Sequence, residues 1–267
     1  MSKFLNPLLH TLENATNSYK YYWLLGILHQ TAIQKQTEIL IEDIFLEMLV
    51  ESWQIFRQFK LYYGFYDQLP LLIDMAREEL QIDDRVKQHD LRKILSENRN
   101  SESIQKVFKH LVKYVPYRFL SSWYPEKLTH LPDGKMHKAI MERSKNDEDI
   151  LYCFVNTDRI HIKELWVTYI NDNYPLLKGF VIGKLNFYLQ KRNPNVPAIP
   201  SKIQGIDKRN LSKAKKIWSQ YLVARKFNFI YSGQIYTGTN FSMDYFLPWS
   251  YVAHDELWNL VPTSVSS

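Results

Sequence analysis

The chain has 267 residues, 45% of them hydrophobic and 15% aromatic, and carries a formal net charge of +6 at pH 7. A chain of this length and apolar content can bury a sizeable core, in one large domain or two. Its single cysteine, Cys153, excludes an internal disulfide and a cysteine-based zinc cluster. No apolar run approaches the roughly 18 residues of a membrane span. We therefore expect a soluble, cytoplasmic protein with no membrane partner, whose positive charge permits an anionic one.

The first part of the sequence predicts a helical domain over residues 1–130. Apolar and aromatic side chains recur there every three or four positions, the period of a helix with one buried face. The pattern predicts helices at 14–34, 38–59, 71–80, 86–98 and 101–114. Over 114–134 three prolines and clustered aromatics indicate a connection, so we place a boundary near residue 130.

Two pairs of like charges lie in the second predicted helix, Glu38 with Glu42 and Glu47 with Glu51. Carboxylates four residues apart share one helix face and can hold metals in helix bundles. The sequence lacks the Glu-x-x-His companion that such sites use. We therefore expect these carboxylates to form a solvated or cation-facing surface.

Residues 131–200 predict an α+β middle region. The run 150–163 reads as two short strands around a turn, and helices are expected at 164–172 and 176–191. Residues 193–200 contain three prolines, which indicates an extended linker before the last part of the chain.

The last part, residues 201–267, opens with a basic segment that is predicted to be helical. Over 202–226 Asp207 is the only acidic residue, against Lys202, Lys208, Arg209, Lys213, Lys215, Lys216, Arg225 and Lys226. One face of this helix is apolar, and the cations opposite could neutralise nucleic-acid phosphates at several points. A solvated helix with charged decoration is the alternative.

Turn signals, aromatics and acidic residues are concentrated in residues 229–262. Residues 230–236 and 241–247 are rich in strand-forming side chains, which predicts two short strands. Pro248 ends the second strand because it has no N–H to donate. His254 and Asp255 can then cap a helical turn through Glu256. The predicted order is strand, strand, turn and helix.

This stretch resembles the HNH endonucleases, which share a ββα-metal fold. The likeness is greatest to bacterial stand-alone HNH proteins, whose core reads Ser-x-Asp-His-Phe-x-Pro-Trp-Ser and then Trp-Asn-Leu-x-Pro. The corresponding residues here read Ser-Met-Asp-Tyr-Phe-Leu-Pro-Trp-Ser and Trp-Asn-Leu-Val-Pro. The motif is also similar to the HNH domain of RNA-guided CRISPR effectors. The segment ATNSYKYYWLLGIL near the N-terminus resembles the N-terminal signature of the stand-alone proteins.

The resemblance implies a mechanism and a set of site residues. In the family, the Asp and a last Asn hold a divalent metal, usually magnesium, while the His takes a proton from the attacking water. The middle Asn orients that His. Carried over, this makes Asp244 a metal ligand, Tyr245 the occupant of the general-base position, and Asn259 the residue that orients it. The motif also favours phosphate contact by the basic helix that precedes it.

Two departures from the family affect the chemistry. A phenol titrates near pH 10 and is a poor base at neutral pH, so Tyr245 does not replace the His. The last family Asn would fall one position beyond Ser267, which truncates the element and leaves any magnesium weakly held or absent. His254 is a possible substitute base, although a capping role is favoured. We also expect Phe246, Trp249 and Trp258 to be buried as a hydrophobic seal.

The sequence thus predicts a mostly helical α+β protein with a large helical N-terminal region and a truncated, HNH-like ββα element. The implied activity is metal-assisted hydrolysis of DNA phosphodiesters in restriction or anti-phage defence, impaired at Tyr245. RNA is an alternative substrate, and a protein partner from a defence system is expected. The alternative function is a non-catalytic nucleic-acid-binding or scaffold protein that retains the fold.

Overall fold

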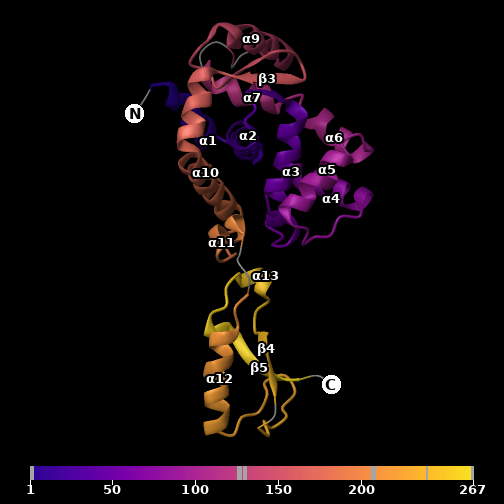
Figure 1. The fold of residues 1–267 in the computed structure, drawn as a ribbon, viewed down its shortest axis with the longest axis vertical. Helices are drawn as coiled ribbons and strands as arrows, with labels where there is room; N and C mark the ends of the chain where they lie inside the picture. Colours follow the sequence, from indigo (N-terminus) through magenta and orange to yellow (C-terminus); the bar gives the residue numbers. More distant parts are fainter. Residues whose placement is uncertain (1–2, 125–127, 129–130, 206–208, 239, 266–267) are drawn as a thin grey trace. The chain divides into compact units, whose positions relative to one another are not determined.

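The structure is a computed structural model that describes residues 3–124, 128, 131–205, 209–238 and 240–265. The chain divides into two compact units, Met1–Asn193 (unit 1) and Pro194–Ser267 (unit 2). Unit 1 is mostly helical with a three-stranded antiparallel sheet, and unit 2 combines short helices with a two-stranded one (Figure 1). Within the described ranges, every helix is too short or too polar to cross a lipid bilayer.

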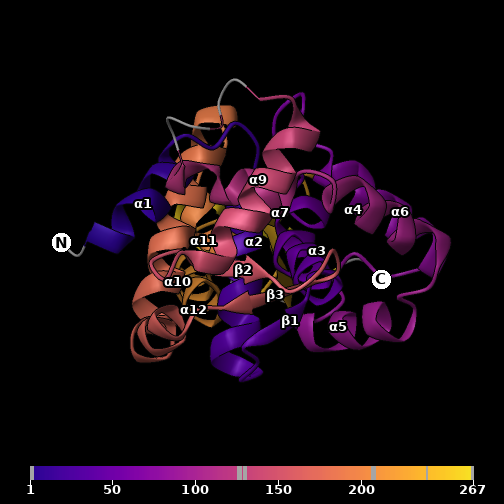
Figure 2. The ribbon, with the colours of Figure 1, turned by 90° about the horizontal axis from the view of Figure 1, so that it is seen from above.

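The core of unit 1 is built around α2 (Tyr19–Leu28), which is buried from Tyr21 to Leu28. This helix lies between α3 (Ile41–Arg57) and α10 (Glu164–Arg192), as Figures 1 and 2 show. Gly26 permits the close approach of α3, because a Cβ built there would lie 2.7 Å from Cγ2 of Ile44. A helix that is apolar on all sides is typical of a protein interior.

The remaining elements of unit 1 surround this core. They are η1 (Lys3–Leu5), α1 (Asn6–Glu13), the π-helix η2 (His29–Ile33), α4 (Leu69–Leu80), α5 (Gln88–Glu97), α6 (Glu102–Leu111), α7 (Val115–Leu120), η3 (Ser121–Trp123) and α9 (Asp133–Asn146). The sheet has the order β1–β3–β2, with β1 at Glu38–Leu40, β2 at Tyr152–Phe154 and β3 at Arg159–Ile162. Residues 38–40, which were predicted to begin a helix, instead form β1, and Glu38 pairs with His161 of the predicted middle region.

Most helices of unit 1 lie where the hydrophobic spacing predicts them. The predicted helices at 164–172 and 176–191 are the two halves of α10, which bends at Asn173, two residues before Pro175. The missing N–H and the ring of a proline interrupt helical hydrogen bonding at such a point. The first predicted helix ends in the π-helical turn η2 instead of continuing regularly to residue 34.

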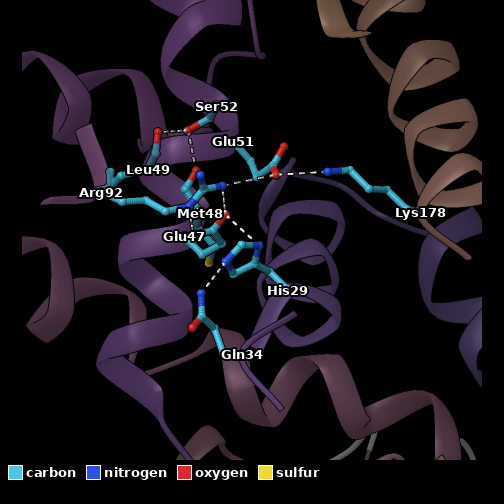
Figure 3. Close-up of polar contacts among 9 residues, drawn as sticks. All are labelled: His29, Gln34, Glu47, Met48, Leu49, Glu51, Ser52, Arg92 and Lys178. Atoms are coloured by element: carbon cyan, nitrogen blue, oxygen red, sulfur yellow. Dashed lines mark hydrogen bonds and ion pairs between the residues drawn. The ribbon is translucent and has the colours of Figure 1, made fainter. Parts of the chain in front are cut away.

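The carboxylates of Glu47 and Glu51 face cations inside unit 1 (Figure 3). Arg92 donates from Nε to Oε2 of Glu47 at 2.8 Å and from Nη2 to Oε1 at 2.5 Å, while Lys178 lies 3.4 Å from Glu51. His29 Nδ1 is 3.6 Å from Glu47 Oε1. Burial raises the pKa of Glu51, and the nearby Lys178 opposes that rise. These two carboxylates thus face cations as expected, but they do so inside unit 1, so the expectation of a surface is wrong for this pair.

Unit 2 packs the helix α12 (Ser212–Ala224) against the strands β4 (Phe241–Tyr245) and β5 (Leu260–Ser264). Leu222, Phe229 and Phe241 form its buried centre. Trp218 on α12 donates from Nε1 to the carbonyl of Leu260 at 2.9 Å, which ties the helix to β5. Unit 2 also contains α11 (Ile199–Gln204), α13 (Trp249–Val252) and η4 (Leu257–Asn259).

The strand order in unit 2 differs from the predicted one. The strand over 241–247 is confirmed as β4, but 230–236 makes only the isolated bridge between Asn228 and Ile235. The partner of β4 is β5, in a region where we expected a helix that begins near Glu256. Val261 and Thr263 favour extended backbone, and Pro262 is tolerated in a strand at a sheet edge.

Lys202 is buried in unit 2 and is therefore not part of an exposed basic face. Its ammonium donates to the carbonyl of Tyr251 at 2.6 Å and to that of Pro197. Burial lowers the pKa of Lys202 to about 8.

The division between the two units falls at the start of the predicted linker, residues 193–200. The last two residues of that linker already belong to α11.

The close approach of α2 and α3 predicts opposite effects for two alanine substitutions. Gly26→Ala should lower the free energy of unfolding by about 1–3 kcal/mol, because the new methyl group overlaps Ile44. Gly183→Ala on α10 should raise it by up to about 1 kcal/mol, because no atom lies within 4 Å of its Cβ and alanine favours helix. Urea denaturation followed by circular dichroism measures both. Equal effects of the two substitutions would contradict the packing.

Candidate functional site

The β4–β5 pair brings the three residues of the predicted catalytic motif to one end of the ladder. Asp244 pairs with Val261 and Tyr245 with Leu260. The next backbone contact runs from the N–H of Phe246 to the carbonyl of Asn259, at 2.9 Å. Residues 15 positions apart in sequence are therefore neighbours in unit 2.

Asn259 is fully buried and is used by the backbone of Leu247. Its Oδ1 accepts from the N–H of Leu247 at 2.7 Å, and its Nδ2 donates to the carbonyl of the same residue at 3.0 Å. Two such bonds fix the direction of the chain as it leaves β4. Both side-chain hydrogen bonds of Asn259 are therefore made to the backbone that follows Tyr245, and not to the phenol of Tyr245.

Tyr245 is held as a neutral hydrogen-bond donor. Its hydroxyl donates to Oδ1 of Asp255 at 2.6 Å. Burial, and then the hydrogen bond and charge of Asp255, raise the pKa of Tyr245 well above its ordinary value of 10.0, and the nearby Arg209 opposes that rise only in part. The phenol is therefore a weaker acid than a free one and has no tendency to become a phenolate near neutral pH.

Asp255 connects three segments of unit 2. Besides the Tyr245 hydroxyl, its Oδ1 accepts from Nε1 of Trp249 at 3.1 Å, and its Oδ2 accepts from the N–H of Asn210 at 2.6 Å. The guanidinium of Arg209 lies over the rings of Trp249 and Tyr245, at 4.7 and 5.5 Å from their centroids. Sequence reasoning gave Asp255 only a capping role, because its partners are 10 and 45 residues distant.

Asp244 is the one predicted metal ligand that the chain supplies at this end of the sheet. It is exposed, and its Oδ1 accepts from the N–H of Tyr245 at 2.8 Å. Across the described ranges, no group of three or more His, Cys, Asp and Glu side chains could hold a metal ion. Magnesium requires several oxygen ligands in near-octahedral geometry. Asp244 therefore has no two partners of these residue types, among the described residues, with which to hold magnesium.

The predicted nucleic-acid contacts are exposed on α12 and the segments that flank it. Lys208 lies outside the described residues; the others, here called the basic surface, are Arg209, Lys213, Lys215, Lys216, Arg225 and Lys226. In the part of the chain that the structure describes, none of the six makes an ion pair with a carboxylate. Their charges are thus available to an anionic partner.

The expected hydrophobic seal is wrong for two of its three members. Phe246 is 61% exposed and Trp258 is 58% exposed, while Trp249 is half-buried against Asp255. The buried centre of unit 2 is formed instead by Leu222 of α12, Phe229 of the following loop and Phe241 of β4. Trp258 packs on the ring of His254, with centroids 5.3 Å apart, so His254 borders an aromatic side chain in the turn before η4.

The Asp255 contact predicts how Tyr245 titrates. In ¹³Cζ-tyrosine NMR, with the resonance assigned by Tyr245→Phe, the pKa should lie above 10.0 and should fall in Asp255→Asn, which removes the charge. Because the folded pKa exceeds the unfolded one, the associated stability is present below about pH 10 and is lost at higher pH.

Asp244→Asn is the matched control for this titration. It removes the adjacent carboxylate charge, which accepts from the backbone N–H of Tyr245 and not from its hydroxyl. The pKa of Tyr245 should change less in this variant than in Asp255→Asn. A wild-type pKa at or below 10, or equal shifts in the two variants, would show that Asp255 does not hold the phenol.

Comparison with protein-family models, with curated proteins and with solved structures found no match to this chain. The roles considered for Asp244, Tyr245 and Asn259 therefore depend on the sequence resemblance and on the geometry of β4 and β5.

Proposed function

We propose that unit 2 binds nucleic acid, DNA in particular, through the basic surface, as a protein related to the HNH endonucleases whose hydrolytic chemistry is impaired at Tyr245. The observation that carries this proposal is the set of six exposed cations without a carboxylate partner among the described residues. Unit 2 contains eight Lys and Arg against four Asp and Glu, so its own charge is also positive.

The distribution of these cations suits a polyanion. Lys213 and Lys216 lie one turn apart on α12, and Arg225 and Lys226 directly follow its end. Each cation that neutralises a phosphate releases a condensed counterion, so binding gains entropy and becomes salt-dependent. The exposed rings of Phe246 and Trp258 offer faces on which unpaired bases could stack, a contribution of about 1–3 kcal/mol per base.

Metal-assisted hydrolysis of the phosphodiester is the second candidate function. The observation in its favour is that β4 and β5 bring Asp244, Tyr245 and Asn259 to one end of the ladder, the residues that the HNH resemblance selects. A bound magnesium ion would supply charge stabilisation at the phosphate. At the position where the family has an imidazole base, this chain has the phenol of Tyr245, whose hydroxyl donates a hydrogen bond to Asp255. Loss of a general base costs about a hundred- to ten-thousand-fold in rate.

The wider role follows the same resemblance. A unit that holds DNA without efficient cleavage would act in restriction or anti-phage defence as a recognition component, together with a protein partner that supplies the reaction. RNA is the alternative ligand, and it would use the same phosphate contacts. Contacts between the basic surface and phosphates carry no information about the bases. The basic surface therefore does not specify a nucleotide sequence.

Replacement of the α12 lysines tests the binding proposal. The variant Lys213→Gln, Lys215→Gln, Lys216→Gln should bind duplex DNA with a slope of log K against log salt that is smaller by about two to three units, at nearly one unit per lost contact. Fluorescence anisotropy at several salt concentrations measures this slope.

The matched control removes three exposed lysines from α9 of unit 1, as Lys135→Gln, Lys138→Gln, Lys145→Gln. This control changes the net charge of the chain equally and should keep the wild-type slope. If both triple variants lower the slope by the same amount, the effect is one of overall charge, and the assignment to α12 is wrong.

A further inference from the structure

Unit 1 contains a pocket that the proposed function does not use. It has a volume of about 170 Å³ and is formed by the first turn of α2, the segment before α4, the end of α6 and the start of α7. Pockets that enclose drug-sized ligands measure roughly 300–1,000 Å³. The pocket therefore suits a small polar head group, with the remainder of a ligand outside.

The walls of the pocket are cationic and aromatic. Lys20, Arg118 and His110 line it, together with the rings of Tyr19, Tyr66 and Tyr114. The guanidinium of Arg118 lies 4.7 Å from the ring centroid of Tyr114, which helps to fix its position. The hydroxyl of Tyr19 accepts from the N–H of Gln68 at 2.7 Å and closes the wall between α2 and the segment before α4.

Lys20 carries a charge that the protein does not neutralise. Within the described ranges it makes no ion pair or hydrogen bond, although it is half-buried beside Arg118. Burial and then the charge of Arg118 lower its pKa. An ammonium group in this position costs free energy unless an anion joins it, because removal from water and a like charge both disfavour the protonated form.

The nearby carboxylates are engaged with other groups. Asp67 accepts from the backbone N–H of Ser18 at 2.6 Å and from that of Leu69 at 3.1 Å. Asp133 contacts Arg118 through Nη2 alone, at 3.2 Å. The other guanidinium nitrogens make no ion pair with a described residue. A forked guanidinium next to a point charge is an arrangement that recognises tetrahedral oxyanions.

We propose that this pocket binds the phosphate group of a small phosphomonoester, with Lys20 and Arg118 as its charge partners. The aromatic rings at the pocket suit a ligand whose phosphate is attached to a ring-bearing group, such as a nucleoside. This site goes beyond the nucleic-acid contact proposed for unit 2, since all its residues belong to unit 1.

Isothermal titration calorimetry in phosphate-free buffer tests the site with three probes: inorganic phosphate, adenosine 5′-monophosphate and uncharged adenosine. The first two should bind saturably to the full chain, and adenosine should not. If the monophosphate binds saturably and inorganic phosphate does not, the site recognises a phosphorylated small molecule. If both bind saturably, the site recognises the phosphate group alone. Absence of saturable binding by both, or adenosine binding as tightly as its monophosphate, would overturn the proposal.

Variants then locate the binding. Lys20→Met should weaken binding about tenfold or more, because hydrogen bonds to charged groups contribute about 1.5–3 kcal/mol and 1.4 kcal/mol is tenfold. Arg118→Gln should also weaken binding. If circular dichroism shows that Lys20→Met does not fold, the affinity of Arg118→Gln becomes the test of the site. Lys109→Gln, an exposed charge on α6 outside the pocket, should leave binding unchanged.

A second control separates this site from the proposed function. The triple variant at Lys213, Lys215 and Lys216 should keep wild-type affinity for the monophosphate, even where it loses affinity for DNA. If that triple variant loses the monophosphate while Lys20→Met and Arg118→Gln retain it, the probe binds the basic surface of unit 2 and the pocket has no part in it.

Discussion

The carboxylate of Asp255 is the contact on which the candidate site of unit 2 depends. Its two oxygens accept three hydrogen bonds, from β4, from α13 and from the segment before α12. Charge-assisted bonds of this kind are about twice as strong as neutral ones. One side chain therefore joins the end of the sheet to the start of the basic helix. The same contact adds to the burial that raises the pKa of Tyr245, although a phenol is protonated at neutral pH even without it.

Two buried carboxylates of unit 1 have cation partners, whereas the basic surface of unit 2 has no carboxylate partner among the described residues. In unit 1, Arg92 and Lys178 face the buried carboxylates of Glu47 and Glu51, so these cations are already neutralised (Figure 3). On the basic surface of unit 2, no described carboxylate lies within ion-pair distance of the six cations. A polyanion gains most where charges are unpaired, because no existing ion pair has to be broken. The clustering of six such cations on and beside α12 is the physical reason for the proposal that nucleic acid binds there.

The helical part of the fold could be predicted because it depends on local spacing. The period of apolar residues predicted the helices α3 and α4 closely, and the two helices expected at 164–172 and 176–191 are the two halves of the bent α10. The strand β5 was not predicted, because His254 and Asp255 also fit a helix-capping pattern, and only the pairing with β4 decides between the two. Phe246 and Trp258 show the same limit, since hydrophobicity alone does not say which aromatic side chains join the core around Leu222, Phe229 and Phe241.

The sequence selected the residues of the candidate site but not their contacts. The motif selected Asp244, Tyr245 and Asn259, and the β4–β5 register does bring them together. Their bonds could not be read from the sequence, because the partners are Leu247 for Asn259 and Asp255 for Tyr245, and no short motif encodes either pair. The same holds for the pocket around Lys20, whose walls come from four separate segments of unit 1.

The central claim is that unit 2 binds DNA while the residue in its general-base position cannot act as a base. A nicking assay on supercoiled plasmid with magnesium, at protein concentrations that saturate the DNA, tests this most directly. The account predicts that the plasmid stays supercoiled and that the wild type and Asp244→Ala are equally inactive. Magnesium-dependent nicking that Asp244→Ala abolishes would contradict the claim that the site is impaired, and nicking that survives Asp244→Ala would contradict the site itself.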